Sequence, residues 1–312
     1  MSEVMADEVA IADELRAEIP DSLVRTGEPL AKRTTLRAGG KADVYVEPSA
    51  EKDLARLIRF CGERNVPFMV LGRGSNLLIR DGGIRGIVIG LTHASFATIE
   101  VFGRQLRCGG GAKLKNVAAR AREAELTGLE FLEGIPGSVG GALRMNAGAM
   151  GGAIFDMVTQ VRFMDDAGEI HERSAASMNA GYRNCPLLAQ CVALGATLAG
   201  EPASREVITA RTNEYNERRW KSQPKEPSAG CIFKNPSAVL TAGKLIDAAG
   251  LKGMRIGGAS VSDVHANFII NDGTATAHDI LELIELIKER VKKDRGIELR
   301  TEVQIVGEDS KT

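Results

Sequence analysis

The 312-residue chain has no excess of charge of either sign. Its 40 basic and 41 acidic residues give a formal net charge of −1 at pH 7. Because binding to nucleic acid or to an anionic membrane usually requires a basic surplus, we expect neither partner. The chain also lacks an apolar run of the roughly 18 to 20 residues needed to cross a bilayer, and it begins with acidic residues instead of a signal peptide. These absences predict a soluble cytoplasmic protein.

Cysteine is scarce and follows no metal-binding or disulfide pattern. The five cysteines are odd in number, widely separated and without C-x-x-C spacing, and they are Cys61, Cys108, Cys185, Cys191 and Cys231. We therefore predict no disulfide framework and no metal site.

The length and the alternation of apolar patterns predict two or three domains of mixed helix and strand. A hydrophobic content of 44% with 26% charged residues is ordinary for a globular protein with a sizeable core. The expected helices cover 7–19, 54–61, 113–125, 205–220 and a capped segment from Thr276 to Gly296. The expected strands cover 42–46, 66–71, 84–91, 98–102, 105–108, 158–164, 169–173, 191–198 and a closing strand over 297–305.

The segment from Gly128 to Gly152 contains eight glycines separated by apolar residues. Glycine allows positive φ and a close approach of backbone to a ligand, so we interpret the segment as a shaped loop. Anchored by its apolar residues, it could present backbone N–H groups to a phosphate-bearing ligand. The alternative is a glycine-rich surface loop that binds nothing.

A second glycine loop follows the apolar run 66–71. Gly72 and Gly74 come directly after the predicted strand, and Ser75 and Asn76 follow them. This order is typical of a phosphate or ribose site. It is not a Walker loop, and it lacks the third glycine of a dinucleotide fingerprint.

Three further motifs, taken with the two glycine loops, make the sequence specific. They are GYRN at 181–184, SAGCIFKNP at 228–236 and ELRTEVQIVG at 298–307. In this order the five motifs resemble the UDP-N-acetylenolpyruvoylglucosamine reductase family from about Thr34 to Gly307. The resemblance implies a flavoenzyme of bacterial peptidoglycan precursor synthesis. Such an enzyme uses FAD and NADPH to reduce the enolpyruvyl group of UDP-N-acetylglucosamine enolpyruvate to UDP-N-acetylmuramate.

The resemblance also implies an α+β fold. Two subdomains of the vanillyl-alcohol-oxidase (PCMH-type) FAD-binding fold would be followed by an α+β substrate-binding domain. The expected division is a leader helix in 1–33, the FAD-binding subdomains in 34–97 and 98–208, and the substrate-binding domain in 209–312.

Residue by residue, the resemblance assigns the FAD contacts to the two glycine loops. They fall on Gly72, Arg73, Gly74, Ser75, Asn76, Gly134, Ile135, Gly137, Ser138, Gly140, Gly141, Asn146, Ala147 and Gly148.

The family's catalytic arginine falls on Arg183 and its catalytic glutamate on Glu302. Strand spacing alone would make Glu302 a solvated edge carboxylate. The proton donor, usually serine in this family, falls on Cys231. A free cysteine is commonly a small core residue, but the intact spacing to the Lys-Asn-Pro motif favours a catalytic role here. A thiol is a much stronger acid than a serine hydroxyl, so it can supply the proton.

Substrate binding is assigned to Lys234, Asn235, His265 and Arg219. Arg218 and Lys221 beside Arg219 are further candidates, because lysine and arginine near a cleft suit a diphosphate. The alternative role of Arg218, Arg219 and Lys221 is to complement the dipole at the C-terminal end of a helix.

Two rival functions stay open on the sequence. An oxygen-using flavin oxidase of the same fold often links its flavin through histidine, and neither glycine loop contains one. A nucleotide-binding protein without catalytic activity is favoured only by the cysteine substitution. We expect the protein to be a monomer.

Overall fold

The computed structural model describes residues 3–237 and 239–310, which divide into two compact units. The first unit comprises Met1–Thr26, Val44–Arg73 and Gly86–Glu217. The second comprises Gly27–Asp43, Gly74–Arg85 and Arg218–Thr312. No helix within the described residues is both long enough and apolar enough to span a bilayer.

The helices and strands of the first unit, including those that continue into the second, match most of the expected ranges. The α-helices are α1 (Glu3–Glu18), α2 (Glu51–Glu63), α3 (Leu114–Glu123), α4 (Val139–Met145) and α5 (Arg205–Ser222). The strands are β1 (Leu23–Pro29), β2 (Lys41–Glu47), β3 (Phe68–Leu71), β5 (Ile84–Gly90), β6 (Ile99–Phe102), β7 (Gln105–Gly109), β8 (Leu126–Thr127), β9 (Gly148–Ala149), β10 (Gly152–Ala153), β11 (Val158–Met164), β12 (Ile170–Ser174), β13 (Val192–Ala199) and β14 (Glu201–Pro202).

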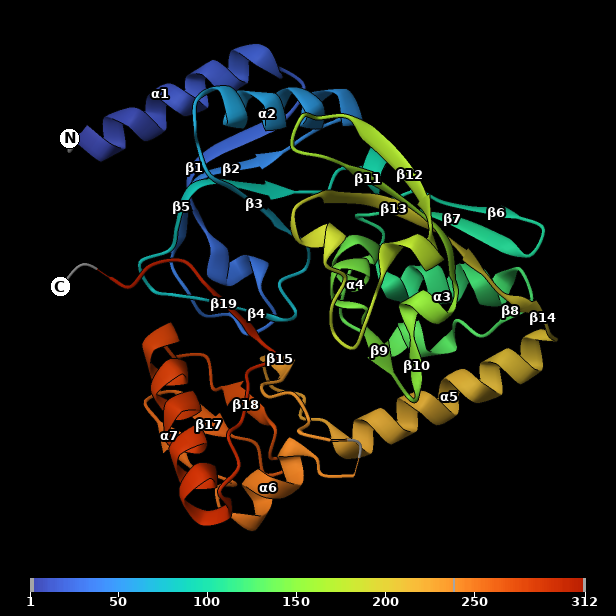
Figure 1. The fold of residues 1–312 in the computed structure, drawn as a ribbon, viewed down its shortest axis with the longest axis vertical. Helices are drawn as coiled ribbons and strands as arrows, with labels where there is room; N and C mark the ends of the chain where they lie inside the picture. Colours follow the sequence, from blue (N-terminus) through green and yellow to red (C-terminus); the bar gives the residue numbers. More distant parts are fainter. Residues whose placement is uncertain (1–2, 238, 311–312) are drawn as a thin grey trace. The chain divides into compact units, whose positions relative to one another are not determined.

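A five-stranded sheet in the order β12-β11-β13-β7-β6 forms the larger part of this unit. Its neighbouring strands are antiparallel, and β11 with β12 forms the hairpin predicted around Asp165 to Gly168. Helices α3 and α4 pack against this sheet (Figure 1). Leu114, Val117 and Ala121 recur at helical spacing and are buried, which explains why α3 forms at this place.

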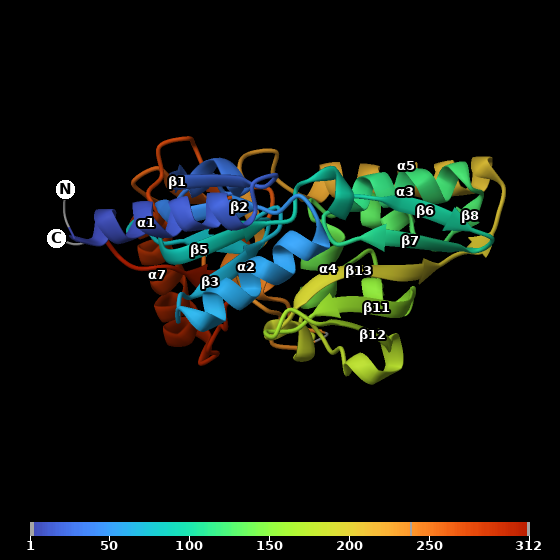
Figure 2. The same cartoon turned by 90° about the horizontal axis from the view of Figure 1, so that it is seen from above.

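The second sheet has the order β1-β2-β5-β3, with β3 and β5 parallel. Helix α2 links β2 to β3 as predicted, and β5 lies between these two strands. Figure 2 shows α1 and α2 beside this sheet. Leu15 of α1 and Leu57 of α2 are completely buried in a core shared with Val46 and Ile89 of the sheet.

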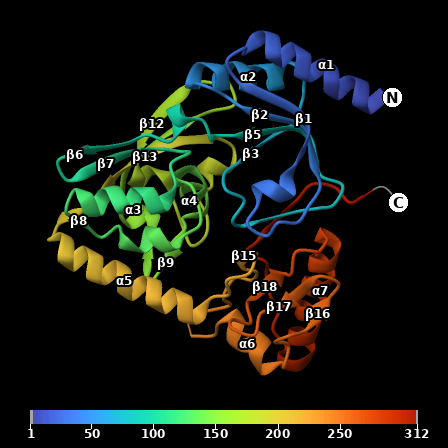
Figure 3. The ribbon, with the colours of Figure 1, turned by 180° about the vertical axis from the view of Figure 1, so that it is seen from behind.

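The second unit has its own sheet and core. Strands β15 (Ser228–Cys231), β18 (Phe268–Asn271), β17 (Ala259–Val261) and β16 (Arg255–Ile256) pair in that order, all antiparallel. Helices α6 (Ala242–Ala248) and α7 (Ala277–Arg295) lie beside this sheet (Figure 3). The expected closing strand is shorter than predicted: β19 covers Gln304–Val306 and pairs in parallel with β4 (Leu77–Ile79), and Thr301 before it forms an isolated bridge.

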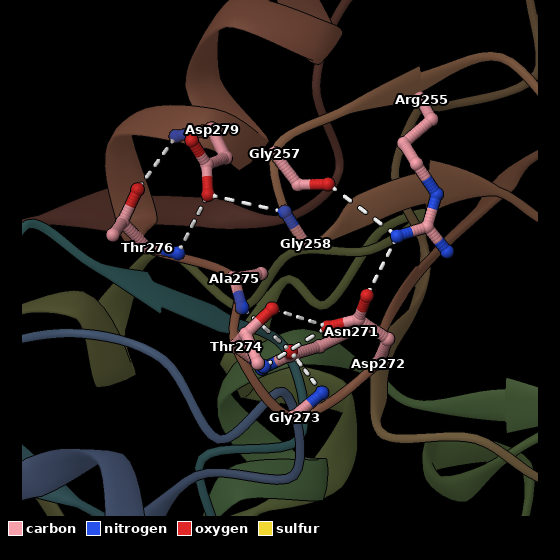
Figure 4. Close-up of polar contacts among 10 residues, drawn as sticks. All are labelled: Arg255, Gly257, Gly258, Asn271, Asp272, Gly273, Thr274, Ala275, Thr276 and Asp279. Carbon is pink, nitrogen blue, oxygen red and sulfur yellow. Dashed lines mark hydrogen bonds and ion pairs between the residues drawn. The ribbon is translucent and has the colours of Figure 1, made fainter.

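The start of α7 confirms the predicted capping box. The Thr276 side chain accepts a hydrogen bond from the Asp279 backbone N–H at 3.0 Å, and the Asp279 carboxylate accepts one from the Thr276 N–H at 2.9 Å (Figure 4). Gly296 ends the helix in the left-handed conformation, with φ at 67°.

The segment from Gly128 to Gly152 is more ordered than a loop. It contains the seven-residue helix α4, whose N-cap Ser138 accepts a hydrogen bond from the Gly141 N–H at 3.5 Å. Val139, Ala142 and Leu143 are buried, so tertiary packing stabilises a helix that its two glycines disfavour. The interpretation as a continuous loop was therefore wrong for 139–145.

Candidate active site

The first unit contains a pocket of about 360 Å³. It is lined by the end of β3 and the residues after it, by residues that follow β5 and β7, by α4 and by the start of β13 with the segment before it. The lining residues are Val70, Leu71, Gly72, Arg73, Leu91, Thr92, Ala97, Gly110, Gly111, Lys113, Asn116, Ser138, Gly140, Gly141, Arg144, Leu188, Cys191, Val192 and Ala193.

Backbone hydrogen bonds hold the walls of this pocket together. The Gly140 N–H donates to the Gly110 carbonyl at 2.8 Å, and the Gly110 N–H donates to the Leu194 carbonyl at 2.6 Å. The Gly111 N–H donates to the Phe96 carbonyl at 2.8 Å. These glycines are needed for close packing, since a Cβ at Gly111 would lie 2.0 Å from the Leu91 carbonyl oxygen. The sequence predicted N–H groups directed at a ligand, and this was wrong for Gly140.

The charges of the lining come from side chains. Arg73, Lys113 and Arg144 contribute cationic groups, and among the lining residues that the structure describes none is acidic. Arg144 donates from Nη1 to the Leu188 carbonyl at 2.9 Å, which fixes its direction. The pocket therefore suits a ligand with a negatively charged group.

Five of the predicted cofactor residues line this pocket, and they are Gly72, Arg73, Ser138, Gly140 and Gly141. Others lie in the same unit but outside its lining, namely Gly134, Ile135, Gly137, Asn146, Ala147 and Gly148. Gly74, Ser75 and Asn76 belong to the second unit. Sequence reasoning missed Lys113, Asn116 and Arg144. The glycines at 109–111 directly after a predicted strand were the signal that could have indicated Lys113 and Asn116.

Arg183 lies in a tight turn in which the Gly181 N–H donates to the Asn184 carbonyl at 2.9 Å. Its backbone has a φ of 55°, which is uncommon for a residue other than glycine. The half-buried guanidinium donates from Nη2 to the Gly148 carbonyl at 3.2 Å and stacks over the Tyr182 ring at 5.2 Å. The arginine is thus held on the segment that follows α4.

Cys231 and Glu302 belong to adjacent segments of the second unit. The Glu302 N–H donates to the carbonyl of Ile232, the residue after Cys231, at 2.7 Å. Phe233 and Thr301 form an antiparallel bridge beside them. Both Cys231 and Glu302 are half-buried. Backbone hydrogen bonds therefore bring the segments of Cys231 and Glu302 side by side, although the two residues are 71 positions apart in the sequence.

Two asparagine side chains fix the backbone at this place. The buried Asn267 accepts from the Phe233 N–H at 3.0 Å and donates to the Phe233 carbonyl at 2.8 Å. Asn76 donates from Nδ2 to the Glu302 carbonyl at 3.1 Å. The side chain of Asn76, predicted as a cofactor contact, is thus used to hold the segment that carries Glu302.

The predicted substrate-binding residues divide into two kinds. Lys234 and Arg219 are half-buried cations, and burial lowers the pKa of Arg219. Asn235 and His265 have structural contacts instead. Asn235 accepts from the Ala242 N–H at the start of α6 at 3.1 Å, and Nδ1 of His265 accepts from the Asn267 N–H at 3.1 Å. Burial lowers the pKa of His265 and so favours its neutral form.

Comparisons with known proteins agree over nearly the whole chain. Residues 42–174 match an FAD binding domain, and residues 223–306 match the C-terminal domain of UDP-N-acetylenolpyruvoylglucosamine reductase. The reductase of Heliobacterium modesticaldum is 46% identical over 90% of each chain. That of Geobacter metallireducens is 45% identical over 95% of this chain and 97% of its own. A crystal structure of the Thermus caldophilus reductase superposes with a TM-score of 0.80 at 37% identity, covering 91% of this chain and 99% of that one. The predicted FAD-binding fold is confirmed.

Proposed function

The chain belongs to the UDP-N-acetylenolpyruvoylglucosamine reductase family, and from this we propose that it reduces UDP-N-acetylglucosamine enolpyruvate to UDP-N-acetylmuramate. It is an FAD-dependent oxidoreductase that uses NADPH and serves peptidoglycan precursor synthesis. The observation that carries the proposal is the identity of 45% over 95% of this chain and 97% of the relative.

The pocket of the first unit fits FAD. Gly141 leaves room for a ligand, because no heavy atom lies nearer than 3.5 Å to a Cβ added there. Arg73, Lys113 and Arg144 would hold the diphosphate, whose charge they complement. When bound, FAD supplies the hydride, taken from NADPH, that saturates the carbon-carbon double bond.

Arg183 would bind the carboxylate of the enolpyruvyl group. Negative charge builds on this carboxylate when hydride reaches the neighbouring double bond. A guanidinium fork matches a planar carboxylate with two parallel hydrogen bonds. Stabilisation of this kind typically contributes about two to three powers of ten in rate.

Cys231 would donate the proton that completes the reduction at the α-carbon. Its Sγ–H bond breaks as the new C–H bond forms, and the resulting thiolate regains a proton from solvent. Glu302, on the adjacent segment, would hydrogen-bond the developing acid. The proximity of the Cys231 and Glu302 backbones supports a shared role for these two residues.

Lys234 and Arg219 would bind the diphosphate of the UDP-sugar, because both are cations with partly buried side chains. Asn235 would contribute through its Nδ2, and a neutral His265 would contribute shape and hydrogen bonding but no charge. We further propose that the protein is a monomer in the bacterial cytoplasm with no nucleic-acid or membrane partner.

Anaerobic stopped-flow absorbance on the yellow protein tests the function. NADPH is expected to bleach the oxidised flavin band, and UDP-N-acetylglucosamine enolpyruvate is expected to restore it in the absence of oxygen. If the oxidised flavin band returns only when oxygen is added, and the flavin stays covalently attached after denaturation, the protein is an oxidase. A protein that binds flavin but is never bleached would be a nucleotide-binding protein without this activity.

A further inference from the structure

Asn146 stands at the end of α4, where it terminates the helix in the left-handed conformation. Its φ is 40°, and its backbone N–H closes the last turn on the carbonyls of Ala142 and Leu143. Asparagine tolerates this conformation better than most residues. The backbone at Asn146 is therefore fixed by the helix.

Both polar atoms of the Asn146 side chain bind other segments of the first unit. Nδ2 donates to the Gly181 carbonyl at 3.0 Å, and Oδ1 accepts from the Phe155 N–H at 3.3 Å. Gly181 is the first residue of the turn that carries Arg183. One amide thus connects the end of α4 to this turn.

The turn is closed by two backbone hydrogen bonds between Gly181 and Asn184. Gly181, Tyr182 and Asn184 are exposed, and Arg183 is in the left-handed region. A conformation that costs about 1 kcal/mol or more persists when neighbouring contacts fix it. The Asn146 bond to Gly181 and the Arg183 bond to Gly148 are two such contacts, and both come from the segment directly after α4.

We propose that Asn146 is a positioning residue for Arg183 and not a contact of the flavin. The proposal rests on the role given to Arg183 under the proposed function. It assigns Asn146 to the step in which substrate is reduced, and it leaves flavin binding to the residues that line the pocket. Helix α4 contributes to both, because its first turn lines the pocket and its C-cap Asn146 holds the turn.

Two substitutions separate the contributions of the side chain and the backbone. Asn146→Asp keeps an oxygen to accept from the Phe155 N–H but turns a carboxylate oxygen toward the Gly181 carbonyl. Asn146→Gly removes both side-chain bonds and keeps a residue that adopts positive φ freely. Asn179→Asp is the matched control, because Asn179 is exposed, has a φ of 50° and lies two residues before Gly181.

We expect both Asn146 variants to slow flavin reoxidation by the enolpyruvyl substrate about 10- to 100-fold, because a displacement near 1 Å costs this much in rate. FAD affinity, measured by titration of the apoprotein, should stay within about threefold of the wild type, and the rate of bleaching by NADPH should not change. Asn179→Asp should match the wild type in all three. A loss of FAD affinity with normal reoxidation of the loaded enzyme would overturn the proposal and make Asn146 a cofactor contact.

Trypsin cleavage after Arg183 gives a readout that does not depend on any activity. Mass spectrometry of brief digests should show faster cleavage after Arg183 in Asn146→Asp and Asn146→Gly than in the wild type or Asn179→Asp. Equal cleavage in all four folded proteins would overturn the proposal even if the enzymatic function were different. A wild-type protein that fails to reduce the enolpyruvyl substrate would instead refute the proposed function.

Discussion

Cys231 is the residue proposed here as the proton donor, at a position where the resemblance leads us to expect serine. Both side chains can donate a proton, so we expect Cys231→Ser to keep substantial activity. Cys231→Ala has no proton to give and should lose about two to four powers of ten in turnover. Flavin reduction by NADPH, measured in the same stopped-flow experiment, should be unchanged in both variants. Near-normal turnover of the alanine variant would remove Cys231 from the mechanism.

Asp272 gives a stability prediction at the same scale. Hydrogen bonds from Thr274 and Arg255 lower the pKa of Asp272 to about 2 (Figure 4). The folded state therefore favours the ionised carboxylate. This stabilisation is complete above the ordinary pKa of about 4 and is lost as the pH falls toward 2.

Asp272→Asn should consequently be less stable than the wild type at pH 6 and should approach it at pH 2. Urea unfolding at several pH values would measure the difference between the two free energies of unfolding. A difference that stays constant from pH 6 to pH 2 would show that the charge of Asp272 does not stabilise the fold.

Among the secondary-structure elements, the sequence predicted long periodic segments well and short packed ones poorly. Helix α7 could be predicted because Thr276, Asp279 and Gly296 mark its ends and Ile280, Ile284 and Ile287 share a face. Helix α4 could not, because it is short, contains two glycines and is stabilised by burial against distant strands. For the same reason the sequence did not predict Arg144 as a pocket residue, because it lines the pocket only when α4 forms a helix.

Gly141 allows a prediction for α4 itself. An added Cβ there would meet only the Ser138 Oγ at 3.5 Å, and Gly141 lines the pocket. Gly141→Ala should therefore keep or slightly raise the stability of the apoprotein, since alanine favours helix by up to about 1 kcal/mol. It should lower FAD affinity about tenfold or more, because the methyl group would occupy ligand space.

Gly62→Ala is the matched control for this prediction. Gly62 lies in α2, has no heavy atom within 4 Å of an added Cβ, and is absent from the pocket lining. The Gly62→Ala variant should gain similar stability, and its FAD affinity should not change. Thermal denaturation of the apoproteins and FAD titration would measure both effects. Equal FAD affinity in the two variants would mean that the flavin does not approach α4 at Gly141.

At the scale of the whole molecule, the candidate residues are distributed over both units. Arg183 belongs to the first unit, and Cys231 and Glu302 belong to the second. The order of the five motifs could assign all three residues from the sequence, because the family relationship spans the chain. The neighbouring position of Cys231 and Glu302 could not be derived from periodicity, because it depends on long-range backbone hydrogen bonds such as that from Glu302 to Ile232.

The two units also have separate hydrophobic cores, which leads to a prediction about unfolding. Leu106 is completely buried in a core of the first unit, and Ile284 is completely buried in the core of the second. Truncating either residue to alanine should cost about 2–5 kcal/mol. Because every residue lining the pocket proposed to bind FAD belongs to the first unit, FAD should stabilise that unit specifically, by about 2.7 kcal/mol at a concentration 100 times its Kd.

Heating should therefore release flavin at the temperature at which the first unit unfolds. Leu106→Ala should lower the temperature at which flavin fluorescence rises. Ile284→Ala should lower the temperature of a separate transition in far-UV circular dichroism and leave the temperature of flavin release unchanged. Excess FAD should raise only the first of these temperatures. If fluorescence and circular dichroism coincide in the wild type and in both variants, the chain unfolds as a single cooperative body and the separate cores do not confer separate stabilities.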